Sequence, residues 1–125
     1  MQGPIKIGLI QINNSFSGQN YLPYSIALLQ TYVQRFAPDS GRYEFLTPLY
    51  KRMRIADAVA AMKDADLVGF STYVWNGRIS LEIARRLKAL KPSIVIVFGG
   101  PHVPDQPEAF LRTHPQIDLA VHNEG

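Results

Sequence analysis

The chain of 125 residues contains no cysteine, which excludes a disulfide framework and a zinc cluster held by cysteines. This composition fits a reducing cytoplasm, where we expect the protein to act. No apolar run approaches the roughly 20 residues that a transmembrane helix needs. Residues 1–6 lack a signal-peptide pattern. We therefore expect neither disulfides nor a membrane partner.

Several nucleotide-binding and catalytic motifs are also missing. Neither G-x-G-x-x-G nor G-x-x-x-x-G-K-[ST] occurs, so dinucleotide and P-loop sites lack their phosphate-binding loop. The hydrolase elbow G-x-S-x-G is absent as well. A receiver domain would need acids after its first strand and an aspartate after its third, where this chain has Asn13, Asn14 and Ser71.

Charge gives little evidence for a partner. The formal net charge is +3, and basic residues gather at positions 51–54 and 85–88. A nucleic-acid surface would interleave such residues with exposed aromatic rings, and this pattern is missing, so we expect no nucleic-acid partner. The histidines at positions 102, 114 and 122 show no metal-ligand spacing with carboxylates. We expect His114 to lie, solvated, at a helix end.

Short β-rich apolar runs alternate with stretches of helical spacing. Strands are expected at residues 5–12, 43–46, 67–73, 93–98 and 119–122, and helices at 23–36, 54–63, 76–90 and 107–113. The run at 93–98 is apolar almost throughout, which is typical of a strand buried on both faces. The alternation predicts one α/β domain with a flavodoxin-like, doubly wound parallel sheet of about five strands in the order 2-1-3-4-5, in three α/β/α layers.

Apolar spacing also predicts the inner face of each helix. The expected inward residues are Ile26, Leu29, Val33 and Phe36 in the first helix, Ile55, Val59 and Met62 in the second, and Ile79, Ile83, Leu87 and Leu90 in the third. Asp105 and Glu108 have the spacing of a capping box that opens the fourth helix.

The candidate functional residues follow the strands, because open parallel sheets bind ligands beyond the carboxyl ends of their strands. The loop after the first strand is long and polar, which favours a functional loop over a plain connection. Its candidate ligand-binding residues are Asn13, Asn14, Ser15, Ser17 and Gly18.

Two hydroxyls and two aromatic rings follow the third strand. These candidates are Ser71, Thr72, Tyr73 and Trp75. In the alternative interpretation, Thr72 or Asn76 only caps the next helix and Trp75 lies in the core. Both interpretations can hold together.

After the fourth strand come Gly99, Gly100, Pro101 and His102. Paired glycines at a buried strand end permit close approach of backbone to a ligand, or a tight turn before the proline. The last candidate is Glu124, which follows the fifth strand.

Three segments together resemble one known family. They are Val68-Gly-Phe-Ser-Thr-Tyr-Val-Trp-Asn76, Ala84-Arg-Arg-Leu-Lys88 and Val97-Phe-Gly-Gly-Pro-His-Val-Pro104, and the ending Glu124-Gly125 fits as well. They resemble the N-terminal cobalamin-binding domain of B12-binding radical SAM proteins. Asn123 stands where that family usually has glycine.

The resemblance implies that cobalamin is the ligand. Ser71 would line the pocket for its nucleotide tail, Gly99 and Gly100 would make room for that tail, and residues 13–20 would pass under the corrin ring. The D-x-H-x-x-G motif of other cobalamin domains is missing, and no histidine precedes His102. A histidine from that loop therefore cannot ligate the cobalt.

The resemblance also implies a longer parent enzyme. The chain stops directly after its last expected strand, so we expect it to be a fragment that is not catalytic alone. A downstream radical SAM domain, with a [4Fe–4S] cluster and S-adenosylmethionine, would be its partner in methyl transfer or oxidative cyclisation.

Two alternatives remain open at this point. Residues 15–18 loosely resemble a flavodoxin phosphate loop, so the domain could hold FMN with Tyr73 or Trp75 beside the ring. The domain could also be a degenerate, ligand-free scaffold that docks on the rest of its chain.

Overall fold

A computed structural model of the protein describes residues 3–13, 15–16, 19–20 and 23–121. The main strands are β1 (Ile5–Ile10), β4 (Tyr43–Phe45), β5 (Leu67–Ser71), β6 (Val95–Gly99) and β7 (Leu119–Ala120). The helices are α1 (Tyr24–Phe36), α2 (Ile55–Met62), α3 (Gly77–Leu90) and α4 (Glu108–Thr113), with a 3₁₀ turn η1 (Ser40–Arg42).

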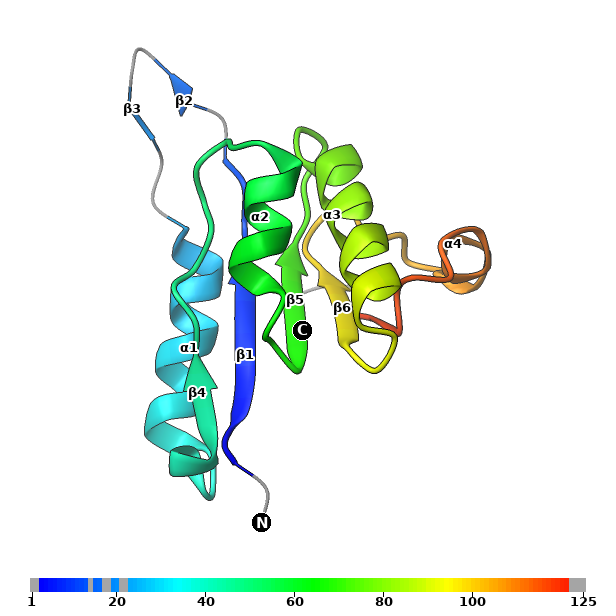
Figure 1. Ribbon diagram of the computed structural model, residues 1–125. Helices are drawn as coiled ribbons and strands as arrows, with labels where there is room; N and C mark the ends of the chain where they lie inside the picture. Colours follow the sequence, from blue (N-terminus) through cyan, green and yellow to red (C-terminus); the bar gives the residue numbers. More distant parts are fainter. Residues whose placement is uncertain (1–2, 14, 17–18, 21–22, 122–125) are drawn as a thin grey trace.

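The five main strands form one parallel sheet in the order β4-β1-β5-β6-β7. This is the predicted order 2-1-3-4-5, and the flavodoxin-like fold is confirmed. Figure 1 shows α2 and α3 in front of the sheet and α1 behind it, next to β1 and β4. The helices thus form outer layers on two sides, as right-handed crossovers between parallel strands require.

The long polar loop expected after β1 contains a small antiparallel ladder. Strands β2 (Ser15–Phe16) and β3 (Gln19–Asn20) pair there, with Ser15 opposite Asn20. The chain after β4 also runs alongside the end of β1. The Gln11 N–H donates to the Leu49 carbonyl at 2.9 Å. This hydrogen bond continues the pairing of β1 beyond Ile10.

The main core lies between the sheet and the α2–α3 layer. Alternate strand residues point to this face, among them the fully buried Ile10, Val68 and Ile96. They pack against the inner sides of α2, α3 and α4. Gly8 belongs to this face too, and a Cβ there would collide with the sulfur of Met62. The glycine therefore lets α2 approach β1 closely.

The opposite sheet face is covered unevenly. Near β1 it is closed by α1, and Leu9 is buried there. Over β6 and β7 it stays partly open, with Val95 36%, Leu119 56% and Val121 39% exposed. The prediction that the 93–98 strand is buried on both faces is therefore wrong. Its apolar run has one face against α3 and the other face toward this opening.

Helix α1 differs most from its predicted packing. Ile26 is buried, but Leu29 is 57% and Phe36 is 61% exposed, so most of the expected inner face is in solvent. The helix approaches the sheet mainly through its first turn, where the Ile26 N–H donates to Gln11 Oε1 at 3.4 Å. Helical periodicity identifies an apolar face, but it does not say how much sheet lies beneath it.

Three smaller expectations are also corrected. Leu90 is 65% exposed because α3 ends there, beyond the buried turns that contain Ile83 and Leu87. The Asp105–Glu108 capping box does not form, since Pro107 is the N-cap of α4 and no side-chain cap hydrogen bond occurs. His114 ends α4 as expected, but it is half-buried with its ring edge-on to Phe110 at 4.9 Å between centroids.

Asp118 joins α3 to the sheet at its amino edge. Its Oδ2 accepts from Lys88 Nζ at 2.6 Å and from the Ile96 N–H at 2.7 Å. Partial burial raises the pKa of Asp118, but the hydrogen bonds from Lys88 and Ile96 outweigh it and hold that pKa below its ordinary value.

We predict that Asp118→Asn lowers the free energy of unfolding at neutral pH by about 1 kcal/mol, because the partly exposed charge-assisted bonds become neutral. A carboxylate with a lowered folded-state pKa stabilises the fold above its unfolded pKa. The difference between the two proteins should therefore shrink as pH falls below about 4. Urea unfolding across this pH range measures it. Asp105→Asn, at an exposed carboxylate before α4, is the control, and an equal effect there would contradict the assignment.

Candidate functional site

The carboxyl ends of β1, β5 and β6 lie at one edge of the sheet, so the loops that follow these strands meet there (Figure 1). Ser71 pairs with Gly99 at this edge. The sequence-predicted residues of β5 and β6 are thus brought together, as the rule for parallel sheets requires.

Small residues lie on the sheet face opposite the main core, just below this edge. Gly69, Ser71 and Gly99 alternate with core residues and therefore point away from α2 and α3. A Cβ on Gly99 would make ordinary contact with the Val121 carbonyl oxygen at 3.7 Å, so no atom blocks a small group at this position. Ser71 is 9% exposed, and a Cβ on Gly69 would lie 3.1 Å from Leu9 Cδ2, so Leu9 covers the lower end of this row.

Thr72 and Gly100 shape the turn between these strands and the next loop. Thr72 is buried, and its Oγ1 donates to the Gly99 carbonyl at 2.7 Å. Gly100 has a φ of 95°, and a Cβ there would lie 2.5 Å from the Thr72 carbonyl oxygen. Only glycine fits this position, because side chains disfavour this φ and the neighbouring backbone leaves no room.

Tyr73 and Trp75 form a stacked aromatic pair at the rim. Their ring centroids are 4.7 Å apart, with the planes 6° from parallel. The Tyr73 hydroxyl lies 3.2 Å from Ser25 Oγ, and Arg52 Nη2 donates to the Trp75 carbonyl at 2.8 Å. Trp75 is 42% exposed, so it does not lie in the core as the alternative interpretation held.

The end of β1 contributes buried amides. Asn13 is buried, and its Oδ1 accepts from Gln11 Nε2 at 3.4 Å. Gln11 was missed by the sequence analysis, although a polar residue within an apolar strand is a usable signal. Asn76 is also buried, and its side chain does not cap α3 but turns back to the strand ends.

The remaining predicted residues are spread more widely. Ser15 lies in β2, and Pro101 and His102 are exposed after β6. The His102 ring lies over the start of α3, within 2.8 Å of where a Cβ on Gly77 would be. Asn14, Ser17, Gly18 and Glu124 lie outside the described residues.

The described residues of this edge are polar, and no pair of acidic and basic groups suited to proton transfer lies among them. The carboxylates with lowered pKa lie elsewhere. The Lys6 N–H, aided by Lys91, lowers the pKa of Asp66 near the amino edge, and Arg85 and Arg86 lower that of Glu82 on α3 to about 2. Among the described residues no His, Cys, Asp and Glu cluster suits a metal ion. The arrangement is built for binding by hydroxyls, amides and aromatic rings.

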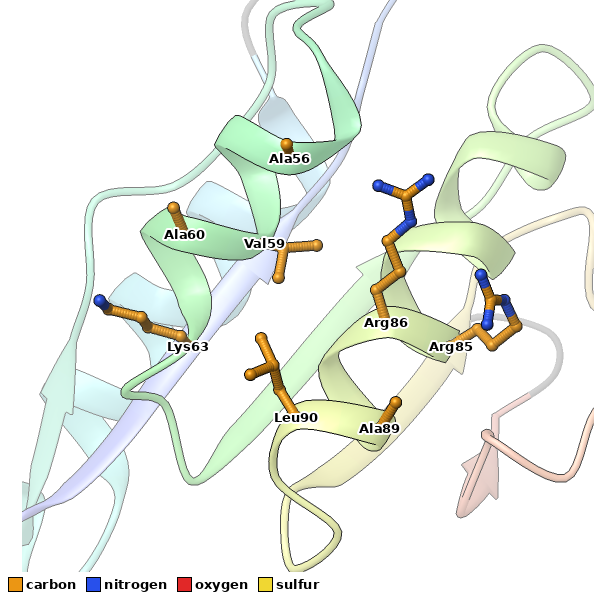
Figure 2. Close-up of a pocket in the computed structure, with 8 residues that line it drawn as sticks. All are labelled: Ala56, Val59, Ala60, Lys63, Arg85, Arg86, Ala89 and Leu90. Atoms are coloured by element: carbon orange, nitrogen blue, oxygen red, sulfur yellow. The ribbon is translucent and has the colours of Figure 1, made fainter.

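An open concavity lies away from this edge. Figure 2 shows a groove between α2 and α3, with Val59 and Leu90 across from each other and Arg86 on its rim. It has a volume of about 560 Å³ and is an open surface feature. It contains none of the candidate ligand-binding residues predicted from the sequence, so it is distinct from the strand-end site.

No helix in the described part of the chain is long and apolar enough to cross a bilayer.

Comparison with known proteins gives this edge its context. Residues 23–125 match the B12 binding domain family. The chain is 37% identical to 2-(S-pantetheinyl)-carbapenam-3-carboxylate methyltransferase of Streptantibioticus cattleyicolor and 33% identical to the cobalamin-dependent radical SAM methyltransferase TokK of Streptomyces tokunonensis, each over 105 residues. These alignments cover 84% of this chain but 15% of each relative. An uncharacterized methyltransferase of Pyrococcus horikoshii is 34% identical over 62 residues, covering 50% of this chain and 14% of that protein. The chain belongs to the B12-binding domain family.

Proposed function

We propose that this chain binds cobalamin at the strand-end edge, with the nucleotide tail on the open sheet face. The observation that carries the proposal is the pairing of two small residues, Ser71 and Gly99, on the sheet face opposite the core, where a Cβ on Gly99 would clash with no atom. Family membership names the ligand, and the geometry supports where it binds. The same membership favours cobalamin over the flavin and the ligand-free alternatives.

The residues present suit the chemistry of this ligand. This sheet face offers Gly99, whose missing side chain allows a ligand group to approach the backbone. Ser71 would donate a hydrogen bond to the tail. The neutral polar groups at the edge, with Asn13 and Tyr73 among them, match the amide side chains of a corrin, which need hydrogen-bond partners and no counter-charge.

The loop after β1 would approach the lower face of the corrin without a histidine. The sequence has none before His102. We therefore propose that no imidazole from this loop ligates the cobalt. The proposal also includes cobalamin contacts from the loops after β1, β6 and β7. The residues concerned are Asn14, Ser15, Ser17, Gly18, Pro101, His102 and Glu124.

We further propose that the domain works within a longer radical SAM methyltransferase. The chain spans 15% of the two methyltransferases that it resembles over most of its length, and one of these is named as cobalamin-dependent and radical SAM. Bound cobalamin would supply a cobalt centre suited to methyl transfer. The partner region would supply the [4Fe–4S] cluster and S-adenosylmethionine, while this chain holds and orients the cofactor.

Trp75 is the only tryptophan of the chain, so its fluorescence reports on the proposed site directly. We predict saturable quenching of its emission as hydroxocobalamin is added, and a corrinoid absorbance spectrum that stays with the protein after desalting. Free N-acetyltryptophanamide corrects for absorption of light by the ligand. Retention of FMN in place of the corrinoid, or quenching that never saturates, would contradict the proposal.

Substitutions of Gly99 and Gly100 should have different effects, one on cobalamin binding and the other on stability. Gly99→Leu should place a side chain where the nucleotide tail is proposed to lie, weaken cobalamin binding by at least about tenfold, and change the free energy of unfolding by less than about 1 kcal/mol, because a Cβ there clashes with no atom. Gly100→Ala should instead cost about 1–3 kcal/mol of stability, because its φ and the Thr72 backbone oppose a side chain. Titration and urea unfolding measure the two effects.

Gly41→Leu is the matched control for Gly99→Leu, because no atom lies within 4 Å of a Cβ there and the residue is far along the chain from the site. Its affinity for cobalamin should equal that of the native protein. Unchanged affinity in Gly99→Leu would place the nucleotide tail elsewhere.

A further inference from the structure

We propose that Asn76 is the positioning residue of the cobalamin site, because it connects the carboxyl ends of β1 and β5. Thr72 connects β5 to β6, so the two side chains together fix these three strand ends relative to one another. This inference rests on the proposed function. It assigns these two residues a role in preparing the site, and neither needs to touch the ligand.

Asn76 holds two strand ends with one amide. Its Nδ2 donates to the Ile12 carbonyl at 2.9 Å, beyond the end of β1, and to the Ser71 carbonyl at 3.1 Å, at the end of β5. Its Oδ1 accepts from the Tyr73 N–H at 2.8 Å. The side chain is fully buried, so water does not compete for these bonds.

The chemistry of this position admits few replacements. Two backbone carbonyls need donors and one backbone N–H needs an acceptor, and a primary amide offers both kinds of group at once. Paired strand residues end at Ile10 and Phe70, so the Ile12 carbonyl lies past the ladder. Asn76 supplies its partner across 64 residues of sequence. A carboxylate would instead face two carbonyl oxygens in a buried place.

Thr72 continues the connection from β5 to β6. Its N–H and its Oγ1 both donate to the Gly99 carbonyl, at 2.8 and 2.7 Å. Its own carbonyl accepts from the His102 N–H at 3.1 Å. Together with Asn76, these bonds run without a break from the end of β1 to the loop after β6.

The hydrogen-bonded chain fixes the spacing of the groups that the ligand would contact. Ser71 directly precedes Thr72, and Gly99 accepts the hydrogen bond of Thr72. Tyr73, whose ring stacks on Trp75, donates its backbone N–H to Asn76. A site that is ordered before the ligand arrives does not lose that ordering free energy on binding. Removing these hydrogen bonds should therefore weaken the affinity for cobalamin by more than the loss of folded protein explains.

The test compares Asn76→Ser, Thr72→Val and the control Ser80→Ala. Serine can still begin a helix but lacks the amide, and valine keeps the shape of threonine without its hydroxyl. Ser80 is a buried neighbour on α3 whose Oγ has no hydrogen-bond partner within the described structure. Each protein is studied for urea unfolding, for hydroxocobalamin affinity corrected to the folded fraction, and for near-ultraviolet circular dichroism without ligand.

We expect the corrected affinity to fall at least about tenfold for Asn76→Ser and about threefold or more for Thr72→Val, from lost ordering of the site. Ser80→Ala should match the native protein. The near-ultraviolet signal of the Tyr73–Trp75 stack should weaken in Asn76→Ser. If Asn76→Ser fails to fold, Thr72→Val, which loses one bond only, carries the same test.

Corrected affinities equal to the native value would overturn the positioning role and leave a purely structural one. A native protein that binds no cobalamin overturns the proposed function instead. The near-ultraviolet signal of the ligand-free variants then still decides the matter for Asn76, because an unchanged signal shows that the amide does not order the loop.

Discussion

One face of the sheet holds this domain together, because α2, α3 and α4 all pack on it. Ile10, Val68 and Ile96 belong to that face and are fully buried, and Gly8 lets α2 come close to β1. Since side chains alternate along each strand, burying one set sends the other to the opposite side. Among the described helices only α1 covers that side, and the region over β6 and β7 stays partly open. The face proposed to bind the ligand is thus the one that the main core leaves free.

Polar groups at the carboxyl edge divide into two kinds. Asn76 and Thr72 are buried and bond to backbone groups, which makes them part of the framework. Ser71 and Gly99 lie on the sheet face opposite the main core. Among the described residues of this edge, no carboxylate has a shifted pKa. This arrangement favours holding a large, mostly neutral cofactor over performing proton transfer, so the chemistry would come from the cofactor and from a partner region.

Periodicity in the sequence was sufficient for the element order and the parallel sheet, because these depend on local patterns and on the handedness of crossovers. The strand-end location of the site stays a prediction from the fold. Periodicity was insufficient for how far each face is covered, so Leu29 and Phe36 were assigned to a core they do not reach. The role of Asn76 also escaped prediction. Its partner Ile12 is 64 residues away, and nothing in the local sequence indicates which carbonyl a buried amide will meet.

The uneven packing has a consequence for how the domain opens. Helix α1 buries only Ile26, whereas α3 buries five residues, including Ile83 and Leu87. Local unfolding of α1 therefore exposes little apolar surface and requires little free energy, while α3 opens only with the whole domain. We therefore expect the amide hydrogens of α1 to exchange with solvent faster than those of α3. The layer over β1 and β4 is thus held less firmly than the layer on the other side of the sheet, although both belong to one domain.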